Sequence, residues 1–156
     1  IVRSAQCSAL MPMMQFSVAP WRVLSEDNMA ICRDMARLHE AMGAEILALA
    51  RASSTSGEPM VRAIEYMYPH QAYSEIKDQF LLGDSILVAP VLEKGKRARS
   101  VVFPPGAWQG DDGSSVIGPC VRTIDVPLAR LPWYRLVTIE QPLGSVEQSL
   151  GAEHIE

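Results

Sequence analysis

The segment from Met11 to Trp21 carries the side chains best suited to a small-molecule site. It places the aromatic rings of Phe16 and Trp21 near Gln15 and Ser17, whose amide and hydroxyl groups form hydrogen bonds. Pocket walls for small molecules commonly combine apolar faces with a few polar groups. The sequence therefore predicts Gln15, Phe16, Ser17 and Trp21 as candidate ligand-binding residues. The alternative is that Phe16 and the methionines of this segment only fill a core.

Arg62 is a candidate of a different kind. It lies in residues 58–67, which read as a strand with Val61 and Ala63 on one side and Arg62 and Ile64 on the other. An unpaired guanidinium in a protein core is very costly, so a buried Arg62 needs a carboxylate partner. Arg62 is then either half of a structural ion pair or a site residue.

The remaining reactive side chains form no recognisable catalytic or metal-binding pattern. His39 lies beside the apolar stripe of an expected helix, where a histidine is usually packed or solvated. The cysteines at positions 7, 32 and 120 are odd in number and far apart, which argues against a zinc knuckle and a disulfide framework. We therefore expect no metal and no cofactor.

Composition excludes several partners. The net charge of -4 arises from 14 basic and 18 acidic residues without a basic stripe, so we expect no nucleic acid partner. Apolar segments fall short of the roughly 20 residues that a bilayer core demands, so no membrane span is expected. The chain begins at Ile1 in mid-pattern, which suggests a fragment of a longer protein, and the compartment stays unknown.

The candidate residues must be positioned by helices and strands. Pro12 and Pro20 predict a loop between Met11 and Ala19, because residues before proline avoid the helical region. Ser25 or Asp27 caps a helix over residues 28–51, with an apolar stripe at three and four residue steps. Residues 58–67 form a strand, and residues 73–82 form a short helix. This alternation is typical of an α/β layer or barrel.

The stretch KDQFLLGDSILVAPVLE, residues 77–93, divides the chain. A helix is expected to end at Gly83, since glycine readily takes the left-handed conformation, and a buried strand follows over Ile86–Leu92. Further strands are expected at residues 98–103, 120–126 and 134–140. Short apolar runs broken by proline and glycine point to an antiparallel sandwich.

Four blocks then carry a resemblance that no single one would establish. They are SGEPMVR at 56–62, DQFLLGDSILVAPV at 78–91, FPPGAW at 103–108 and PLARLP at 127–132. In this order they resemble blocks of glycoside hydrolase family 31, the retaining α-glucosidases and α-xylosidases. The second is nearly identical to the family's DQFLLGDDLLVAPV.

The resemblance implies a fold class of α/β plus all-β. Residues 1–82 would be the last strands and helices of a catalytic (β/α)8 TIM barrel, and residues 83–140 an antiparallel β-sandwich domain after it. Residues 141–156 would be a polar tail. A whole barrel takes about 250 residues. The remainder of the barrel would therefore be this chain's partner.

The resemblance also bears on the sugar. Arg3, Gln6, Ala9 and Pro12 align with a family segment whose continuation ends on a sugar-contacting histidine. Here Gln15 stands at an arginine position and Ser17 at the histidine position, where serine can donate a hydrogen bond but carries no charge. The variant MPMMQFS is similar to the branch of myogenesis-regulating glycosidases, which favour α-galactosides, so a substrate other than a glucoside is possible.

Retaining hydrolysis needs two carboxyl groups about 5–5.5 Å apart. In this family both are aspartates upstream of every matched block, and none of Asp27, Asp34, Asp78 and Asp84 matches a catalytic motif. The resemblance therefore implies no catalytic residue here. The expected function is the C-terminal portion of an α-glucosidase or α-galactosidase type glycosidase, acting on terminal α-linked O-glycosides with retention.

In that function Gln15, Phe16, Ser17 and Trp21 would wall the sugar pocket and contact an α-linked oligosaccharide, while Arg62 would support the last barrel strand. The alternative is a truncated or degenerate, non-catalytic chain that acts as a carbohydrate-binding or scaffold domain.

Overall fold

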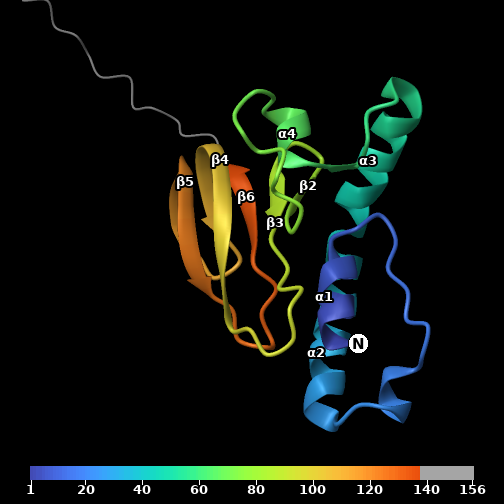
Figure 1. Cartoon of the computed structure of the whole chain (residues 1–156). Helices are drawn as coiled ribbons and strands as arrows, with labels where there is room; N and C mark the ends of the chain where they lie inside the picture. Colours follow the sequence, from blue (N-terminus) through green and yellow to red (C-terminus); the bar gives the residue numbers. More distant parts are fainter. Residues whose placement is uncertain (138–156) are drawn as a thin grey trace, which may run out of the picture.

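The computed structural model describes residues 1–137, and Figure 1 shows a group of helices beside a sheet. The helices are α1 (Val2–Ala9), the 3-10 helix η1 (Pro20–Arg22), α2 (Glu26–Ala41), α3 (Gly43–Ser56) and α4 (Ile64–Met67). The strands are β1 (Val61–Arg62), β2 (Phe80–Leu82), β3 (Ile86–Val88), β4 (Ala98–Gly110), β5 (Ser115–Asp125) and β6 (Trp133–Val137). The expected tail 141–156 and the end of the expected strand 134–140 lie outside the described residues.

The expected helix over residues 28–51 is two helices. Ser25 takes the N-cap position of α2, and Glu26 and Asp27 occupy its first turn, where acidic side chains interact favourably with the helix dipole. The helix is interrupted at Met42, which ends α2 and precedes Gly43, the first residue of α3. Glycine is a poor residue for a helix interior, so the break falls where helix propensity is weakest.

The expected loop between Met11 and Ala19 is confirmed, because these residues form no regular helix or strand before η1 begins at Pro20. The helix α1 precedes this loop. It buries Val2, Ala5 and Ala9, which recur at three and four residue steps and so share one helix face.

Two predictions around the centre of the chain are wrong. The expected strand over 58–67 keeps only Val61 and Arg62, and the chain then turns into α4. The expected helix over 73–82 is absent, and its last three residues are β2. Cross-strand pairing with β3 overrides the helix-like spacing here. Gly83 has the expected positive φ of 63°, but in the β2–β3 turn.

All strand pairs among residues 1–137 are antiparallel, in one sheet of order β1-β2-β3-β6-β4-β5. Val61 of β1 and Val88 of β3 therefore belong to the same sheet, and the change of architecture does not fall at Gly83 as expected. It falls between the end of α3 at Ser56 and β1. The parallel strands of a TIM barrel, expected in residues 1–82, are not present in this part of the chain.

The sheet folds over on itself at β4. The first half of β4, through Phe103, pairs only with β5, whereas Ala107–Gly110 also pair with β6. The pairing register shifts between Phe103 and Gly106, beside two prolines that lack a backbone N–H. The two parts of the sheet thus face each other, and the rings of Phe103 and Tyr134 pack edge to face with their centroids 4.7 Å apart. This arrangement is consistent with the expected β-sandwich.

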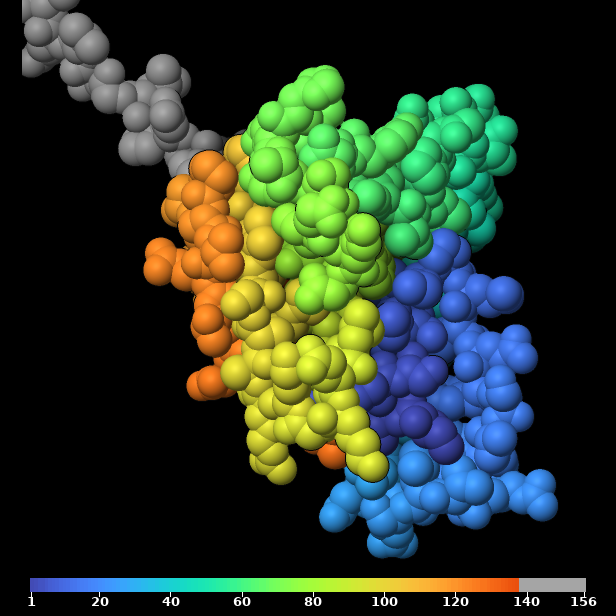
Figure 2. All heavy atoms as spheres, viewed as in Figure 1, coloured from blue at the N-terminus to red at the C-terminus, as the bar shows by residue number. Residues whose placement is uncertain are grey.

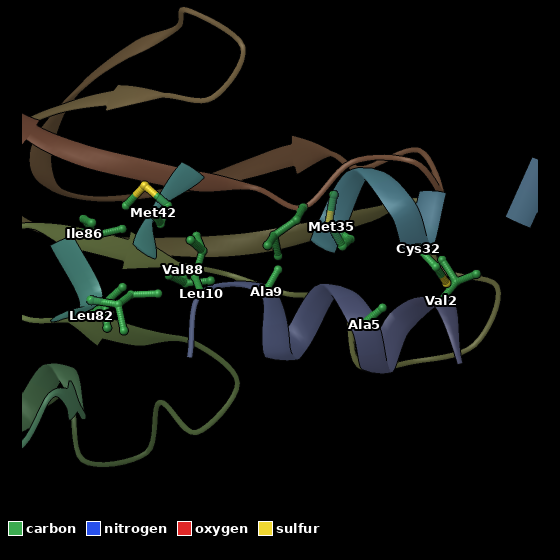
Figure 3. Close-up of a cluster of buried hydrophobic side chains, with 12 residues drawn as sticks. Val2, Ala5, Ala9, Leu10, Cys32, Met35, Met42, Leu82, Ile86 and Val88 are labelled. Carbon is green, nitrogen blue, oxygen red and sulfur yellow. The ribbon is translucent and has the colours of Figure 1, made fainter. Parts of the chain in front are cut away.

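The β2–β3 hairpin is buried on both faces. Leu82, Ile86 and Val88 point to the helices α1–α3, whereas Leu81 and Leu87 point into the folded sheet. We call these two apolar clusters the helix-side core, drawn in Figure 3, and the sheet-side core. Because successive strand residues face opposite sides, a strand covered on both sides needs the uninterrupted apolar run that starts at Ile86.

Candidate functional site

The start of α1 and the loop that follows it enclose a hollow of about 240 Å³, which we call the α1 hollow. It is lined by Ile1, Ser4, Ala5, Gln15, Phe16, Ser17 and Val18. Three residues singled out from the sequence, Gln15, Phe16 and Ser17, thus lie together. In Figure 2 the dark-blue α1 lies between the lighter-blue segment that follows it and the yellow β3–β4 region.

The α1 hollow offers polar groups around an aromatic ring. Gln15 and Ser17 are exposed, and Phe16 is half-buried because its ring packs against the helix-side core. Ser4 supplies a second hydroxyl, which the sequence analysis missed because α1 itself was not predicted. An amide, two hydroxyls and a fixed apolar ring can bind a polyhydroxylated ring through hydrogen bonds and stacking.

Trp21 lines a different hollow, of about 220 Å³, between η1 and α2. Phe16, Pro20 and Trp21 form one wall of it, and Met29, Cys32, Arg33 and Ala36 form the other. Phe16 is shared by both hollows and separates them. Trp21 is 72% exposed, so a face of its indole is open to solvent. The structure therefore brings Trp21 next to Phe16 but outside the α1 hollow.

Arg62 lines neither hollow. Its Nε donates to the carbonyl of Pro59 at 2.8 Å, and its Nη1 contacts the sulfur of Met67 at 3.1 Å. It is half-buried, and no carboxylate among residues 1–137 lies within ion-pair distance of it. Arg62 thus joins β1 to α4 through neutral partners, and the ion pair expected for a buried Arg62 is not formed within this range.

Neither hollow contains a carboxylate among the described residues that line it. Asp34 is exposed and pairs with Arg37, Asp78 pairs with Arg99 at 3.0 Å, and Asp27 lies in the first turn of α2. His39 contacts the Ala9 carbonyl through Nδ1 at 3.0 Å, so it packs α2 against α1. The site can bind and orient a ligand, but these residues provide no acid and nucleophile pair.

The thiols of Cys7 and Cys32 are not activated either. Burial raises the pKa of Cys7 and of Cys32, which leaves each thiol protonated and weakly nucleophilic. Within residues 1–137 no group of His, Cys, Asp and Glu side chains could hold a metal ion. No helix in this range is both long and apolar enough to cross a bilayer.

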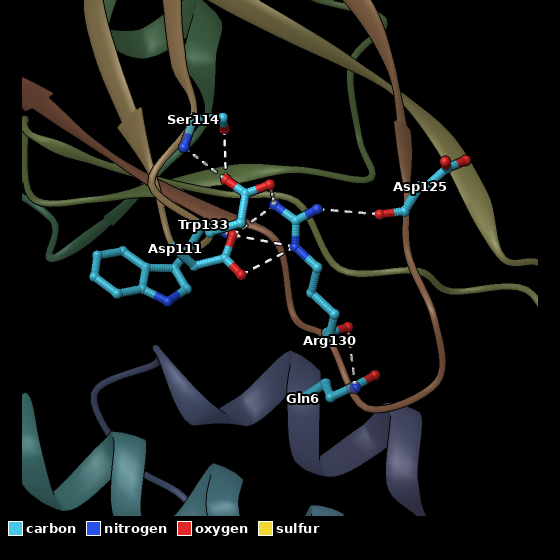
Figure 4. A network of polar contacts seen from close by, with 7 residues as sticks. Gln6, Asp111, Ser114, Asp125, Arg130 and Trp133 are labelled. Atoms are coloured by element: carbon cyan, nitrogen blue, oxygen red, sulfur yellow. Dashed lines mark hydrogen bonds and ion pairs between the residues drawn. The ribbon is translucent and has the colours of Figure 1, made fainter.

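A buried polar network joins α1 to the sheet, and the sequence analysis did not assign it a role. Gln6 is 1% exposed, and its Nε2 donates to the carbonyls of Leu128 at 2.7 Å and Arg130 at 3.2 Å. Arg130 in turn binds the carboxylate of Asp111, as Figure 4 shows. Arg130 lies in the block at 127–132, and Gln6 lies in the segment with Arg3, Ala9 and Pro12 that aligns with the family, so the resemblance was the signal available for these two residues.

Comparison with known protein families gives one clear match. Residues 57–135 match the model of the glycosyl hydrolase family 31 C-terminal domain. This range begins at Gly57, directly after α3, and ends within β6. The matched part is therefore the antiparallel sheet.

Two curated relatives and one solved structure extend the match into the helices. The chain is 38% identical to the myogenesis-regulating glycosidase of Mus musculus, over 81% of this chain and 18% of that protein. It is 33% identical to the SITS-binding protein of Tetronarce californica, over 71% of this chain and 16% of that protein. A family 31 dextranase of Flavobacterium johnsoniae, complexed with isomaltotriose, superposes with a TM-score of 0.82 at 27% identity, covering 86% of this chain and 18% of that one. The chain spans less than a fifth of each of these proteins.

Proposed function

Because this chain belongs to glycoside hydrolase family 31, we propose that it is the C-terminal portion of a longer glycosidase that hydrolyses terminal α-linked O-glycosides with retention. The observation that carries the proposal is the α1 hollow, where Gln15, Phe16 and Ser17 meet without a carboxylate among the lining residues. Such a wall binds a sugar but leaves the nucleophile and the general acid to another part of the protein.

The helices and the sheet belong to different domains in this proposal, because the architecture changes between them. We place α1, α2 and α3 with the catalytic barrel, whose parallel strands would lie elsewhere in the longer protein. The sheet from β1 to β6 forms the domain after the barrel, and the start of the family match at Gly57 supports this boundary. The boundary thus moves from residue 82, where the sequence pattern suggested it, to about residue 57.

The substrate class is an α-linked oligosaccharide or glycoside. The dextranase is complexed with isomaltotriose, an α-glucoside, which makes α-glucosides plausible substrates here. The neutral Ser17 and Gln15 leave an α-galactoside equally open, because both ligands would be held by hydrogen bonds from uncharged groups. Phe16 would contact the apolar face of the sugar, with Trp21 extending that surface beyond the hollow.

The test uses the longer protein with 4-nitrophenyl α-glucoside and 4-nitrophenyl α-galactoside. We expect turnover of at least one, and proton NMR should show the α-anomer of the released sugar first, because two displacements retain configuration. The isolated polypeptide of 156 residues should turn over neither. Turnover by the isolated polypeptide would refute the assignment of the catalytic pair to another part of the protein.

A second candidate is a non-catalytic chain that binds carbohydrate or acts as a scaffold. It is favoured by the uncharged Gln15 and Ser17, and one relative is named for binding a compound rather than for hydrolysis. Sugar binding by the longer protein, measured by calorimetry, without turnover of either glycoside would establish this function and exclude the first.

A further inference from the structure

The α1 helix forms one wall of the α1 hollow, yet its polar anchors lie in connections between the strands of the sheet. Arg3 donates through Nη2 to the carbonyl of Lys96 at 3.0 Å, in the β3–β4 connection. Through Nη1 it donates to Oε1 of Gln6 at 2.9 Å. The amide nitrogen of Gln6 reaches two carbonyls of the β5–β6 connection, at Leu128 and Arg130. The position of α1 is therefore set from two connections at one end of the sheet.

Because of helix geometry, the contacts of α1 with the sheet affect the position of the side chains that line the hollow. Successive residues of an α-helix are rotated by about 100°, so Ser4 and Gln6 point roughly 200° apart, to nearly opposite sides of α1. Ser4 faces the hollow and Gln6 faces the sheet. A shift or rotation of α1 at Gln6 therefore moves the wall that Ser4 and Ala5 form.

The β5–β6 connection is itself held by Arg130. The guanidinium binds Asp111 through Nε at 3.0 Å and Nη2 at 2.8 Å, and Nη2 also pairs with Asp112 at 2.9 Å. A further bond runs from Nη1 to the Asp125 carbonyl at 3.1 Å. The pairing of Arg130 with Asp111 is bidentate, a geometry that fixes the relative orientation of the guanidinium and the carboxylate.

Asp111 carries the chain of contacts into the strands. It directly follows β4, and its backbone N–H donates to the carbonyl of Trp133, the first residue of β6, at 2.9 Å. The series Asp111, Arg130, Gln6 thus runs without interruption from the β4–β5 turn to the helix beside the hollow (Figure 4).

We infer that Gln6, Arg130 and Asp111 are positioning residues through which the sheet holds α1 in place as a wall of the sugar-binding hollow. This inference rests on the proposed function for the identity of the ligand, but not for the coupling between Asp111 and α1. None of the three side chains lines the hollow, so each acts through the placement of α1.

The experiment compares Gln6→Met and Asp111→Ala in the longer protein. Gln6→Met keeps the length of the side chain but removes the donors to Leu128 and Arg130. Matched controls are Gln109→Met on the exposed side of β4 and Asp34→Ala on the surface of α2. The measurements are KM and kcat with the two 4-nitrophenyl glycosides, and backbone amide hydrogen exchange of residues 5–10.

We expect KM to rise about tenfold in both variants, equivalent to about 1.4 kcal/mol, with kcat changed far less, because the wall binds substrate and transition state alike. Exchange of the α1 amides should quicken about tenfold or more, while exchange in β4 and both controls stay at the wild-type level. A merely structural role would quicken amide exchange in α1 and in β4 together and would leave KM of the folded enzyme unchanged.

Two results would overturn the inference. One is unchanged α1 exchange in Asp111→Ala, which would break the link from the turn to the helix. The other is quickened α1 exchange with an unchanged KM, which would separate α1 from the hollow. If the wild-type protein turns over neither glycoside, the proposed function fails, and α1 exchange alone then decides whether Asp111 holds α1.

Discussion

The side chain of Gln79 pairs with the backbone of Val102 in β4 as a neighbouring strand would, and its replacement should destabilise the sheet. The side chain is buried, its Nε2 donates to the Val102 carbonyl at 2.7 Å, and its Oε1 accepts from the Val102 N–H at 3.0 Å. It stands on the side of β4 where β6 no longer pairs. Gln79→Leu leaves both backbone groups of Val102 without a partner.

The magnitude follows from those two groups. An unsatisfied buried donor or acceptor costs about 1–3 kcal/mol. Val102 is half-buried, which places each cost near the lower bound, and the added leucine offsets a part. We expect Gln79→Leu to lower the free energy of unfolding by about 1–2 kcal/mol, and urea unfolding followed by tryptophan fluorescence and circular dichroism measures this. Exchange of the Val102 amide should quicken by a corresponding factor.

The matched control is Gln109→Leu, the same substitution at an exposed position of β4, the strand that Gln79 contacts, expected within about 0.5 kcal/mol of wild type. Equal effects of the two substitutions would refute the reasoning. Gln79→Glu adds a pH test, because a protonated carboxyl can donate to the Val102 carbonyl and a carboxylate cannot. The folded pKa of this Glu lies above its unfolded value of about 4.3, so its stability is fully present below that pH and falls as pH rises.

Three further outcomes are expected. Phe16→Ala should raise KM of the longer protein about tenfold and also lower its unfolding temperature, because the ring packs against the helix-side core. The exposed Val23→Ala is the control, and an unchanged KM would remove Phe16 from the sugar wall. The hydrogen bond from Ser114 lowers the pKa of Asp112, and the charge of Arg130 lowers it further, so the stability that Asp112 provides is present above pH about 3.8 and is lost at lower pH. Asp112→Asn should therefore weaken the loss of stability at acid pH, as measured by urea titrations. Glu45→Gln should cost below about 1 kcal/mol, and less in high salt, because its pair with Arg135 at 2.9 Å is partly exposed; a salt-independent cost would contradict this.

The sequence predicted features that depend on local chemistry. The apolar run over Ile86–Leu92 indicated a buried strand, and β3, which is shorter and ends at Val88, is covered on both sides. The prolines at 12 and 20 indicated the loop that carries Gln15, Phe16 and Ser17, and these three residues do share one hollow. The family blocks indicated glycoside hydrolase family 31, and the family match confirms it.

Features that depend on distant partners could not be read from spacing. Ile76 and Phe80 lie at helical spacing, but Ile76 packs against the sheet-side core from the connection before β2, and Phe80 packs against the helix-side core from β2. The separation of Trp21 from the α1 hollow depends on α2, which supplies the opposite wall. Gln6 meets partners more than 120 residues away, and no local pattern reveals such contacts.

The β2–β3 hairpin, covered on one side by helices and on the other by the folded sheet, has a consequence for engineering. A chimera that exchanges the helices or the sheet between relatives must choose a donor for this hairpin, and either choice leaves one of its faces against a foreign surface. Crossovers should therefore be accompanied by matched residues at Leu82, Ile86 and Val88, which contact the helices, or at Leu81 and Leu87, which contact the sheet. A clean exchange of independent modules is not available in this architecture.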